Sequence, residues 1–229
     1  ARFTAEYKLD DKTQLTGELR GVAFDGTGSG DGLYETRNAA GAVTSAYRRV
    51  GDSDFTFNNW GATARVLRRF DGDGHEWSNE LRYDSNANDT TSQTLTTFLI
   101  PAGAALYERT RTAVDQVTWG FTSAYTRPMS DGGKLRLGYE LNAQRPEQDA
   151  EFLRGPSQAA LAPVPALNNR FEATQTVHAL YTTYERPLGE KLSAQLGLRL
   201  EQADIEIKDL TSGTSASQDL LGRAAGRGG

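Results

Sequence analysis

The stretch KLRLGYELNAQ, residues 134–144, decides the fold, because apolar and polar side chains alternate through it without a break. Leucine, tyrosine and alanine occupy the odd positions, while charged residues, amides and one glycine occupy the even positions. A period of two residues is that of a β-strand with one apolar and one polar face. The same alternation returns in KLSAQLGLRLE, residues 191–201, and in RFTAEYKL, residues 2–9. The sequence therefore predicts an all-β chain.

Eight antiparallel strands are predicted from this pattern. They lie near residues 2–10, 13–24, 55–70, 75–86, 111–127, 134–148, 171–187 and 191–207. Short turn sequences separate alternate pairs of them: LDDKT (9–13), FDGDGH (70–75), MSDGGK (129–134) and PLGEK (187–191). Long polar stretches, which we interpret as loops, separate the other pairs at 25–54, 86–111 and 151–171. TLTTFLI (94–100) within the second stretch is also strand-like and could extend its neighbours outward.

The length of these strands indicates a membrane. Most of the predicted strands have 12 to 17 residues, whereas strands of soluble proteins usually have about five or six. Long strands joined by short turns at one end and long loops at the other are typical of a transmembrane β-barrel of the outer membrane. Lipid contacts only alternate residues in such a barrel, so no continuous apolar segment is needed. We expect residues 1–209 to form the barrel segment, in contact with outer-membrane lipid of a Gram-negative bacterium.

Aromatic and charged residues on the apolar face support this interpretation. Tyr7, Phe70, Trp77 and Tyr125 cluster beside the short turns, where an interfacial aromatic girdle would lie. The charges predicted to intrude on that face come near strand ends, where their cost in lipid is small: Arg68, Asp115 and Glu185. A set of charged residues is predicted to face the lumen instead: Glu18, Arg20, Arg65, Glu80, Arg82, Arg136, Glu140, Arg199 and Glu201.

Composition excludes several functions. The 229 residues include 25 Lys+Arg and 30 Asp+Glu without a basic block, so we expect no nucleic-acid partner. There is no Cys, which excludes disulfides and thiol chemistry. DGTGSGDG (25–32) lacks the features of a phosphate or calcium loop, and FDGDGHEW (70–77) is interpreted as a tight turn. His178 is expected on the polar face of its strand. We predict no enzyme, catalytic residue, metal or cofactor.

Two hairpins resemble a known family. HALYTTYERPLGEKLSAQLGLRLEQADIEI (178–207) and WGFTSAYTRPMSDGGKLRLGYELNAQR (119–145) resemble the barrel of TonB-dependent outer-membrane receptors, in which the return strand reads like L-x-x-x-x-G-L-R-x-E. The corresponding residues run from Leu192 to Glu201. The resemblance implies import of a scarce nutrient such as an iron chelate (siderophore), a vitamin or an oligosaccharide. It also implies a plug, the remainder of a larger barrel, and a TonB-type energy-coupling protein acting through an N-terminal part that this sequence lacks.

Two other functions remain open at this stage. One is a self-contained small outer-membrane barrel that serves as an anchor or adhesin, and the other is a soluble β-sandwich binding module. The aromatic residues of the predicted loops that could contact a ligand are Tyr34, Tyr47 and Phe152.

Three further expectations concern the strands themselves. Residues 210–229 change to Thr, Ser, Ala, Gly and Arg, and we expect them to form a flexible or non-native tail. The strands near 2–10 and 191–207 are expected not to pair, because the charged inward faces suit a wide lumen rather than a closed eight-stranded barrel. The apolar positions shift from even to odd after Leu200, which predicts a β-bulge near Glu201–Gln202 or emergence from the membrane there.

Overall fold

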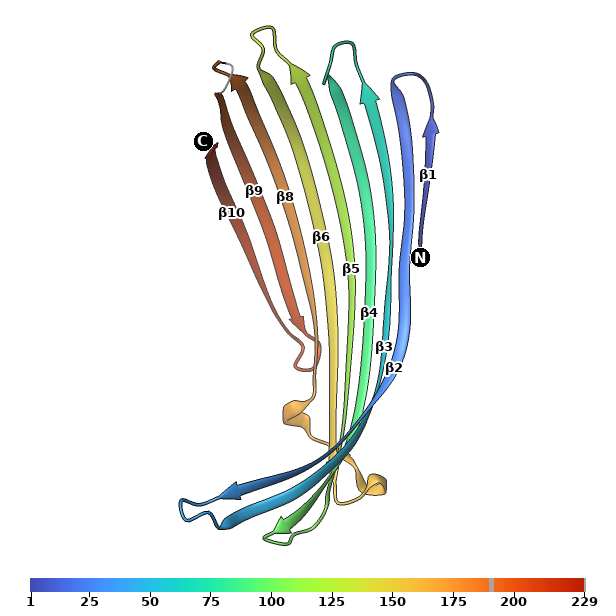
Figure 1. The fold of residues 1–229 in the computed structure, drawn as a ribbon, viewed down its shortest axis with the longest axis vertical. Coiled ribbons are helices and arrows are strands. Elements are labelled where there is room, and N and C mark those ends of the chain that lie inside the picture. Colours follow the sequence, from blue (N-terminus) through green and yellow to red (C-terminus); the bar gives the residue numbers. More distant parts are fainter. Residues whose placement is uncertain (190–191, 229) are drawn as a thin grey trace.

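One antiparallel β-sheet runs through residues 1–189 and 192–228, the residues that the computed structural model describes (Figure 1). Its strands are β1 (Arg2–Lys8), β2 (Thr13–Arg37), β3 (Val43–Arg69), β4 (Glu76–Ile100), β5 (Leu106–Pro128), β6 (Lys134–Gly155), β7 (Ala162–Pro163), β8 (Asn169–Pro187), β9 (Ser193–Asp209) and β10 (Thr214–Gly228). Two short 3₁₀ turns, η1 (Gln158–Ala160) and η2 (Pro165–Leu167), lie between β6 and β8. The all-β prediction is confirmed, and within these residues no helix is long and apolar enough to cross a membrane.

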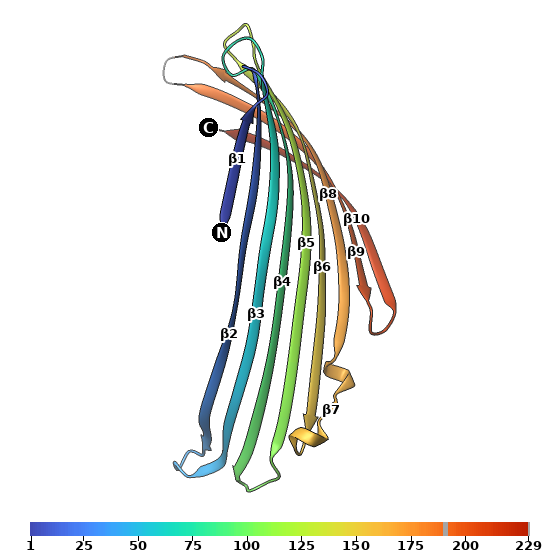
Figure 2. The same cartoon turned by 90° about the vertical axis from the view of Figure 1, so that its right-hand side faces the viewer.

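The sheet is open in the part of the chain that the structure describes. The strands follow one another in the order β1-β2-β3-β4-β5-β6-β8-β9-β10, and β7 pairs with β6 beside this path. β1 and β10 stand at opposite edges of a bowed, single-layered surface (Figures 1 and 2). β9 lies between β8 and β10, so it does not pair with β1. This confirms the prediction that strands 2–10 and 191–207 are not neighbours, and the sheet is not the small closed barrel considered as an alternative.

The prediction of three long loops is wrong for most of their residues. β2 and β3 continue through 25–37 and 43–54, and β4 and β5 continue through 86–100 and 106–111. Of the third stretch, 156–168 remains outside the long strands. The physical reason is that both faces of these strand extensions are polar. The alternation of apolar residues therefore disappears while the backbone ladder continues.

The flexible tail predicted for residues 210–229 is also not what the structure contains. Residues 214–228 form β10, which pairs with β9 in an unbroken antiparallel register from Thr214–Asp209 to Gly228–Gln195. The small and polar composition of this segment obscured its strand character. Any strand that lies beside an open edge gains backbone hydrogen bonds, whatever its side chains are.

The register places apolar side chains on one face, which we call the outer face, and charged ones on the other, the inner face. In the β5–β6 pair, for example, Tyr125 stands beside Leu137 and Phe121 beside Leu141, while Thr122 stands beside Glu140 on the other face. The large outer residues are exposed, with Leu180 at 60% and Leu196 at 58%. The buried apolar residues among those described are few and mostly small: Ala46, Ala124, Leu153 and Ala179. The sheet therefore buries its apolar face against lipid rather than against a second layer.

The apolar band on the outer face has clear limits. Trp77 and Tyr125 lie side by side at the end near the short turns, and the Trp77 Nε1 donates to Ser123 Oγ at 2.9 Å. Trp60, Tyr83 and Trp119 form a continuous row across β3–β5, with ring centroids 4.8 and 4.6 Å apart. About ten residues of a strand tilted by about 40° span about 25 Å, the height of the lipid-facing band.

Beyond the band, the outer face becomes charged and several of its charges are paired. Arg145 binds Glu172 at 2.5 Å, and Arg170 binds Glu147 at 2.5 Å. Further along the strands, Arg48 pairs with Asp31, which holds the pKa of this aspartate below its ordinary value. These pairs show that the long strands continue out of the lipid into water.

Two residues lie on the face opposite to the predicted one. Glu185 stands beside Lys134 on the inner face, not on the apolar face. His178 stands beside Leu141 on the outer face and bonds the hydroxyl of Tyr139 at 2.8 Å, not on the polar face. The sequence of β8 has threonine and tyrosine on both faces, so only its pairing with β6 settles which face is which. Arg68 and Asp115 do lie on the apolar face, beside Trp77 and Ala87.

The predicted bulge near Glu201–Gln202 is absent. β8 and β9 pair without a register shift from Phe171–Asp209 to Pro187–Ser193. Leu198 and Leu200 therefore share the outer face with Gln202, and Ile205 and Ile207 point to the inner face. The apolar positions change from even to odd where β9 reaches the edge of the apolar band that lies away from the predicted short turns. The remaining explanation is therefore that β9 leaves the membrane there.

The short turns predicted from the sequence at 9–13, 70–75 and 129–134 lie together at one end of the sheet, and the turns β2–β3, β4–β5 and β9–β10 lie at the other (Figure 1). All five described glycines with positive φ, a backbone conformation that L-residues rarely adopt, lie in turns between strands: Gly41, Gly72, Gly74, Gly132 and Gly213. Between β5 and β6, the hydroxyl of Tyr184 and the backbone N–H of Gly133 donate to the Asp131 carboxylate. These hydrogen bonds hold the pKa of Asp131 below its ordinary value of 3.8. The turn between β8 and β9 includes residues 190–191, which lie outside the described residues.

We predict that Leu137→Arg blocks assembly in the outer membrane, whereas Arg136→Gln is tolerated. Leu137 faces lipid, where the cost of an arginine rises from about 0–1 kcal/mol at the interface to about 2–4 kcal/mol at the midplane, and Arg136 faces the lumen. Heat-modifiable migration of outer-membrane fractions on gels measures assembly. If Arg136→Gln were the more damaging of the two, the assignment of the faces would be inverted.

We predict that Asp131→Asn lowers the thermal stability of the folded protein at pH 7 and has no effect at strongly acidic pH. A carboxylate with a depressed pKa stabilises the fold above its unfolded pKa, and this contribution is lost as the pH falls through the folded pKa. Melting temperatures of both proteins between pH 2 and pH 7 test this. A difference that persists at the lowest pH contradicts the role of the ionised group.

Candidate functional site

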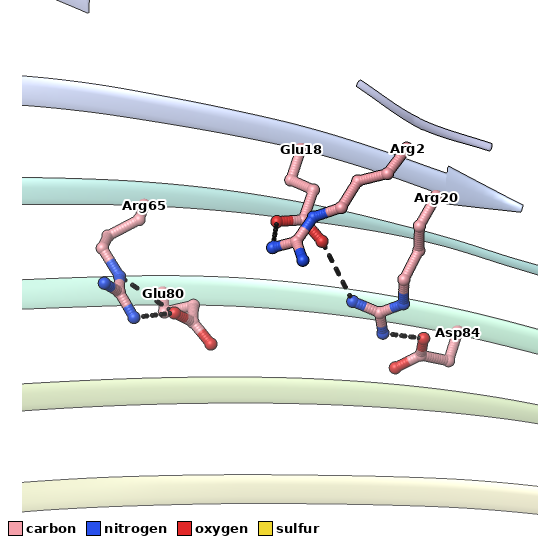
Figure 3. A network of polar contacts seen from close by, with 6 residues as sticks. All are labelled: Arg2, Glu18, Arg20, Arg65, Glu80 and Asp84. Atoms are coloured by element: carbon pink, nitrogen blue, oxygen red, sulfur yellow. Dashed lines mark hydrogen bonds and ion pairs between the residues drawn. The ribbon is translucent and has the colours of Figure 1, made fainter. Parts of the chain in front are cut away.

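The inner wall near the short turns is a network of ion pairs between strands (Figure 3). Arg2 of β1 binds Glu18 of β2 at 2.5 Å, and Arg20 lies 3.6 Å from the same carboxylate. Arg20 also reaches across β3 to bind Asp84 of β4, which Arg82 approaches at 3.2 Å. The network therefore joins β1, β2 and β4 over the backbone of β3, where Gly61 leaves room because a Cβ there would lie 3.1 Å from the Arg20 Nε.

Two further groups extend this charged zone. Arg65 donates to Glu80 through Nε at 3.0 Å and Nη2 at 2.6 Å (Figure 3). Arg199 of β9 binds Glu140 of β6 and Glu201 of its own strand, each at 2.7 Å. The ring of Tyr181 lies between Arg136 and Arg199, whose guanidinium carbons are each 5.9 Å from the ring centroid. Every charged residue predicted to face the lumen lies on this inner face.

Further from the short turns, the inner wall of β4–β6 carries amides instead of charges. We call Asn86, Asn88, Gln116, Asn142 and Gln144 the amide row. Within it, Asn88 donates to Asn86 at 2.9 Å, and Gln144 donates to Asn142 at 2.8 Å. Gln116 donates to Gln144 at 3.4 Å, which connects β5 with β6.

A cluster of three phenylalanine rings adjoins the amide row. Phe24 of β2 stacks obliquely on Phe57 of β3 with centroids 4.9 Å apart, and it meets Phe55 edge-on at 6.0 Å. We call these residues the phenylalanine cluster. Phe57 pairs in register with Asn88, so the cluster and the row share a border. The Phe55 ring lies over Gly26, where a Cβ would stand 2.4 Å from a ring carbon.

A second charged group closes the far end of this surface. Glu108 of β5 accepts from Arg49 of β3 at 2.8 Å and from Arg154 of β6 at 2.7 Å. The Glu108 side chain is only 10% exposed because the two guanidinium groups cover it. The inner wall of β2–β6 is therefore charged near the short turns, neutral in the middle and charged again beyond.

The three ligand-contact candidates lie on strands rather than in loops. Tyr34 of β2 and Tyr47 of β3 stack with centroids 4.9 Å apart, and Phe98 of β4 lies 6.3 Å from Tyr47. Phe152 lies on β6, three strands away from β3, with the Arg154 guanidinium 5.1 Å from its ring centroid. All three point to the inner face, and their contact with a ligand stays a prediction.

Sequence reasoning missed the amide row and the phenylalanine cluster. Several of these residues fell in stretches interpreted as loops, where no face was assigned. Phe55–Phe57 and Asn86–Asn88 each repeat at a spacing of two, and this signal could have placed each pair on one face. DGTGSGDG likewise lies within β2, with its glycines on the inner face.

His75, in the turn at 70–75, is held by an aromatic contact and by a hydrogen bond to a neighbouring strand. Its ring lies 4.6 Å from the Phe70 ring, and Nε2 is 2.8 Å from the Tyr125 hydroxyl. In residues 1–189 and 192–228, no group of three or more His, Asp or Glu side chains is placed to hold a metal ion.

Residues 68–222 match the outer membrane protein beta-barrel family. Because this match covers more than half of the chain, the chain belongs to that family, and it is located in the outer membrane of a Gram-negative bacterium. A search of the curated proteins finds no match.

Three solved structures are similar to the chain in fold. They are the unliganded ferric citrate transporter FecA (11% identity, TM-score 0.39, 97% of this chain and 40% of that one), the ferric yersiniabactin uptake receptor FyuA from Yersinia pestis (10%, 0.35, 98% and 40%) and the copper transporter OprC (12%, 0.35, 97% and 40%). The chain spans about 40% of the length of these structures. Identities this low say nothing of what this chain binds.

We predict that Arg20→Gln lowers the free energy of unfolding by about 0.2–1 kcal/mol and that high salt reduces this loss. The Arg20 side chain is 36% exposed, so water screens its pairs with Glu18 and Asp84. Urea unfolding of the detergent-folded protein at low and high salt measures the effect. Arg48→Gln, which removes a more exposed pair on the outer face, is the control and should lose less. An equal loss in both variants contradicts the network.

Proposed function

We propose that this chain forms part of the barrel of a TonB-dependent receptor that imports a scarce nutrient across the outer membrane. The observation that carries the proposal is the charged inner wall opposite an apolar outer band on a wide, open sheet. A closed eight-stranded barrel leaves a lumen just wide enough for side chains, whereas larger barrels enclose water or a plug. Arg–carboxylate pairs that line a wall need such a polar interior.

The proposed partners follow from this arrangement. Outer-membrane lipid covers the apolar band. The remainder of the parent barrel would pair with the free edges of β1 and β10, since unpaired backbone groups cost several kcal/mol each in lipid. A plug would contact the charged zone, where Tyr181 and its two arginines border a hollow of about 400 Å³. A TonB-type energy-coupling protein would act through the plug and not through residues 1–209.

Transport fits the inner wall better than adhesion or catalysis. An adhesin would need no continuous polar wall along the inside of long strands. A soluble β-sandwich would bury its apolar face against a second sheet, but the large outer side chains here are exposed on a single layer. The candidate nutrients are an iron chelate, a vitamin or an oligosaccharide, and the family membership alone does not choose between them.

Deletion of the complete gene should reduce uptake of one of these nutrient classes at low external concentration. Uptake of labelled ferric chelates, cobalamin and oligosaccharides is measured in the deletion strain, in a strain that lacks the energy-coupling protein, and in a strain complemented with the intact gene. We expect the same loss in the first two strains and recovery in the third. Normal uptake of all classes together with reduced surface attachment contradicts import and favours the anchor or adhesin.

A further inference from the structure

The neutral middle of the inner wall is the feature of this sheet that the proposed function does not explain. On the inner faces of β2–β6, the described residues between the Arg20–Asp84 pair and the Arg49–Glu108–Arg154 group are uncharged. They include the amide row and the phenylalanine cluster, together with Thr and Ser. Charges are frequent elsewhere on both faces, so a ligand that passes this surface meets neutral polar groups and aromatic rings instead.

The amide row offers donors and acceptors side by side. Each Asn or Gln side chain carries two N–H donors and one carbonyl acceptor. The three hydrogen bonds within the row use one donor each, so most of its N–H groups remain available to water or to a ligand. A hydroxyl group both donates and accepts, and it therefore matches an amide in either orientation. A carboxylate or phosphate only accepts and gains most from cations, and the described cations that border this surface already bind carboxylates.

The phenylalanine cluster supplies apolar ring surface next to these amides. Phe24 is 51% exposed and Phe55 is 37% exposed, although both face the lumen and not lipid. The face of an aromatic ring carries partial negative charge, and the C–H groups on the flat side of a sugar ring are weakly positive. Ring faces that adjoin amides suit a molecule with an apolar flat side and hydroxyls at its edge.

We propose that the phenylalanine cluster and the amide row form a binding surface for a neutral oligosaccharide. This inference rests on the proposed function and narrows its substrate class. Phe24 and Phe55 stack on a sugar ring, while Asn88 and its neighbours hydrogen-bond the hydroxyls of that ring and of the next. At each end of the surface, the arginines bind the carboxylates beside them, and these charged groups do not contact the sugar.

Binding to the full-length receptor in detergent tests this proposal. The probes are an array of neutral glycans built from hexoses, pentoses and N-acetylhexosamines, with ferric citrate as the anionic comparator. Isothermal titration then measures the Kd of the best neutral glycan for two variants, Phe24→Ala and Asn88→Asp. Phe24→Ala should weaken binding about tenfold, because it removes a ring contact worth about one order of magnitude. Asn88→Asp should also weaken it, because a carboxylate has no N–H to donate.

Matched controls lie on the outer face, one on the strand that carries Phe24 and one on β3, the strand next to Asn88. Leu33→Ala removes a side chain of β2 that is 60% exposed, and Asn58→Asp changes an exposed amide of β3. Both should leave the Kd unchanged, and heat-modifiable migration confirms that all four variants are folded. Equal losses in the inner and outer variants, or no binding of any neutral glycan, overturn the inference.

Two outcomes separate this inference from the proposed function. If ferric citrate binds and glycans do not, the import function stands without this substrate class. If the gene deletion affects no uptake, the import function itself fails.

Discussion

The requirement that every backbone N–H and C=O in the apolar band be paired underlies the rest of this structure. Lipid offers no hydrogen bonds, so each strand within the band depends on a neighbour on both sides. The long registers of β2–β6 and of β8–β9 meet this requirement, since the only register shifts described in them, at Thr36–Arg37 and Ala46–Tyr47, lie at the far strand ends beyond the band. The same ladder of hydrogen bonds continues well beyond the band. Water could bond the backbone N–H and C=O groups there, but the neighbouring strands still do so.

A fixed register decides which face each residue lies on, and the two faces meet different surroundings. The outer face is apolar only over the height of the lipid and becomes a set of Arg–carboxylate pairs beyond it. The inner face carries polar residues along its whole length, with the phenylalanine cluster among them, and needs no such limit. This explains why β9 changes the parity of its apolar residues after Leu200 without any bulge. The environment changes there while the strand geometry stays the same.

The inner wall is divided by charge along its length. The ion pairs near the short turns cross several strands, as the link from Arg2 to Asp84 through Arg20 shows, so they tie together elements far apart in sequence. The neutral amide and phenylalanine surface follows, and the partly buried Glu108 with its two arginines lies beyond it. The inner wall therefore presents three different environments along its length.

The sequence by itself determined the β-strand class, the short turns and the faces of the strongly alternating strands, because in lipid one face must be apolar and the other need not be. It placed Leu137 and Arg136 on their faces for this reason. It did not determine the strand extensions at 25–54 and 86–111, β10, or the faces of Glu185 and His178. In those segments both faces are polar or of mixed character, so no periodic signal marks them. There the tertiary structure alone decided, since the hydrogen bonds of the neighbouring strand set both the extent and the register.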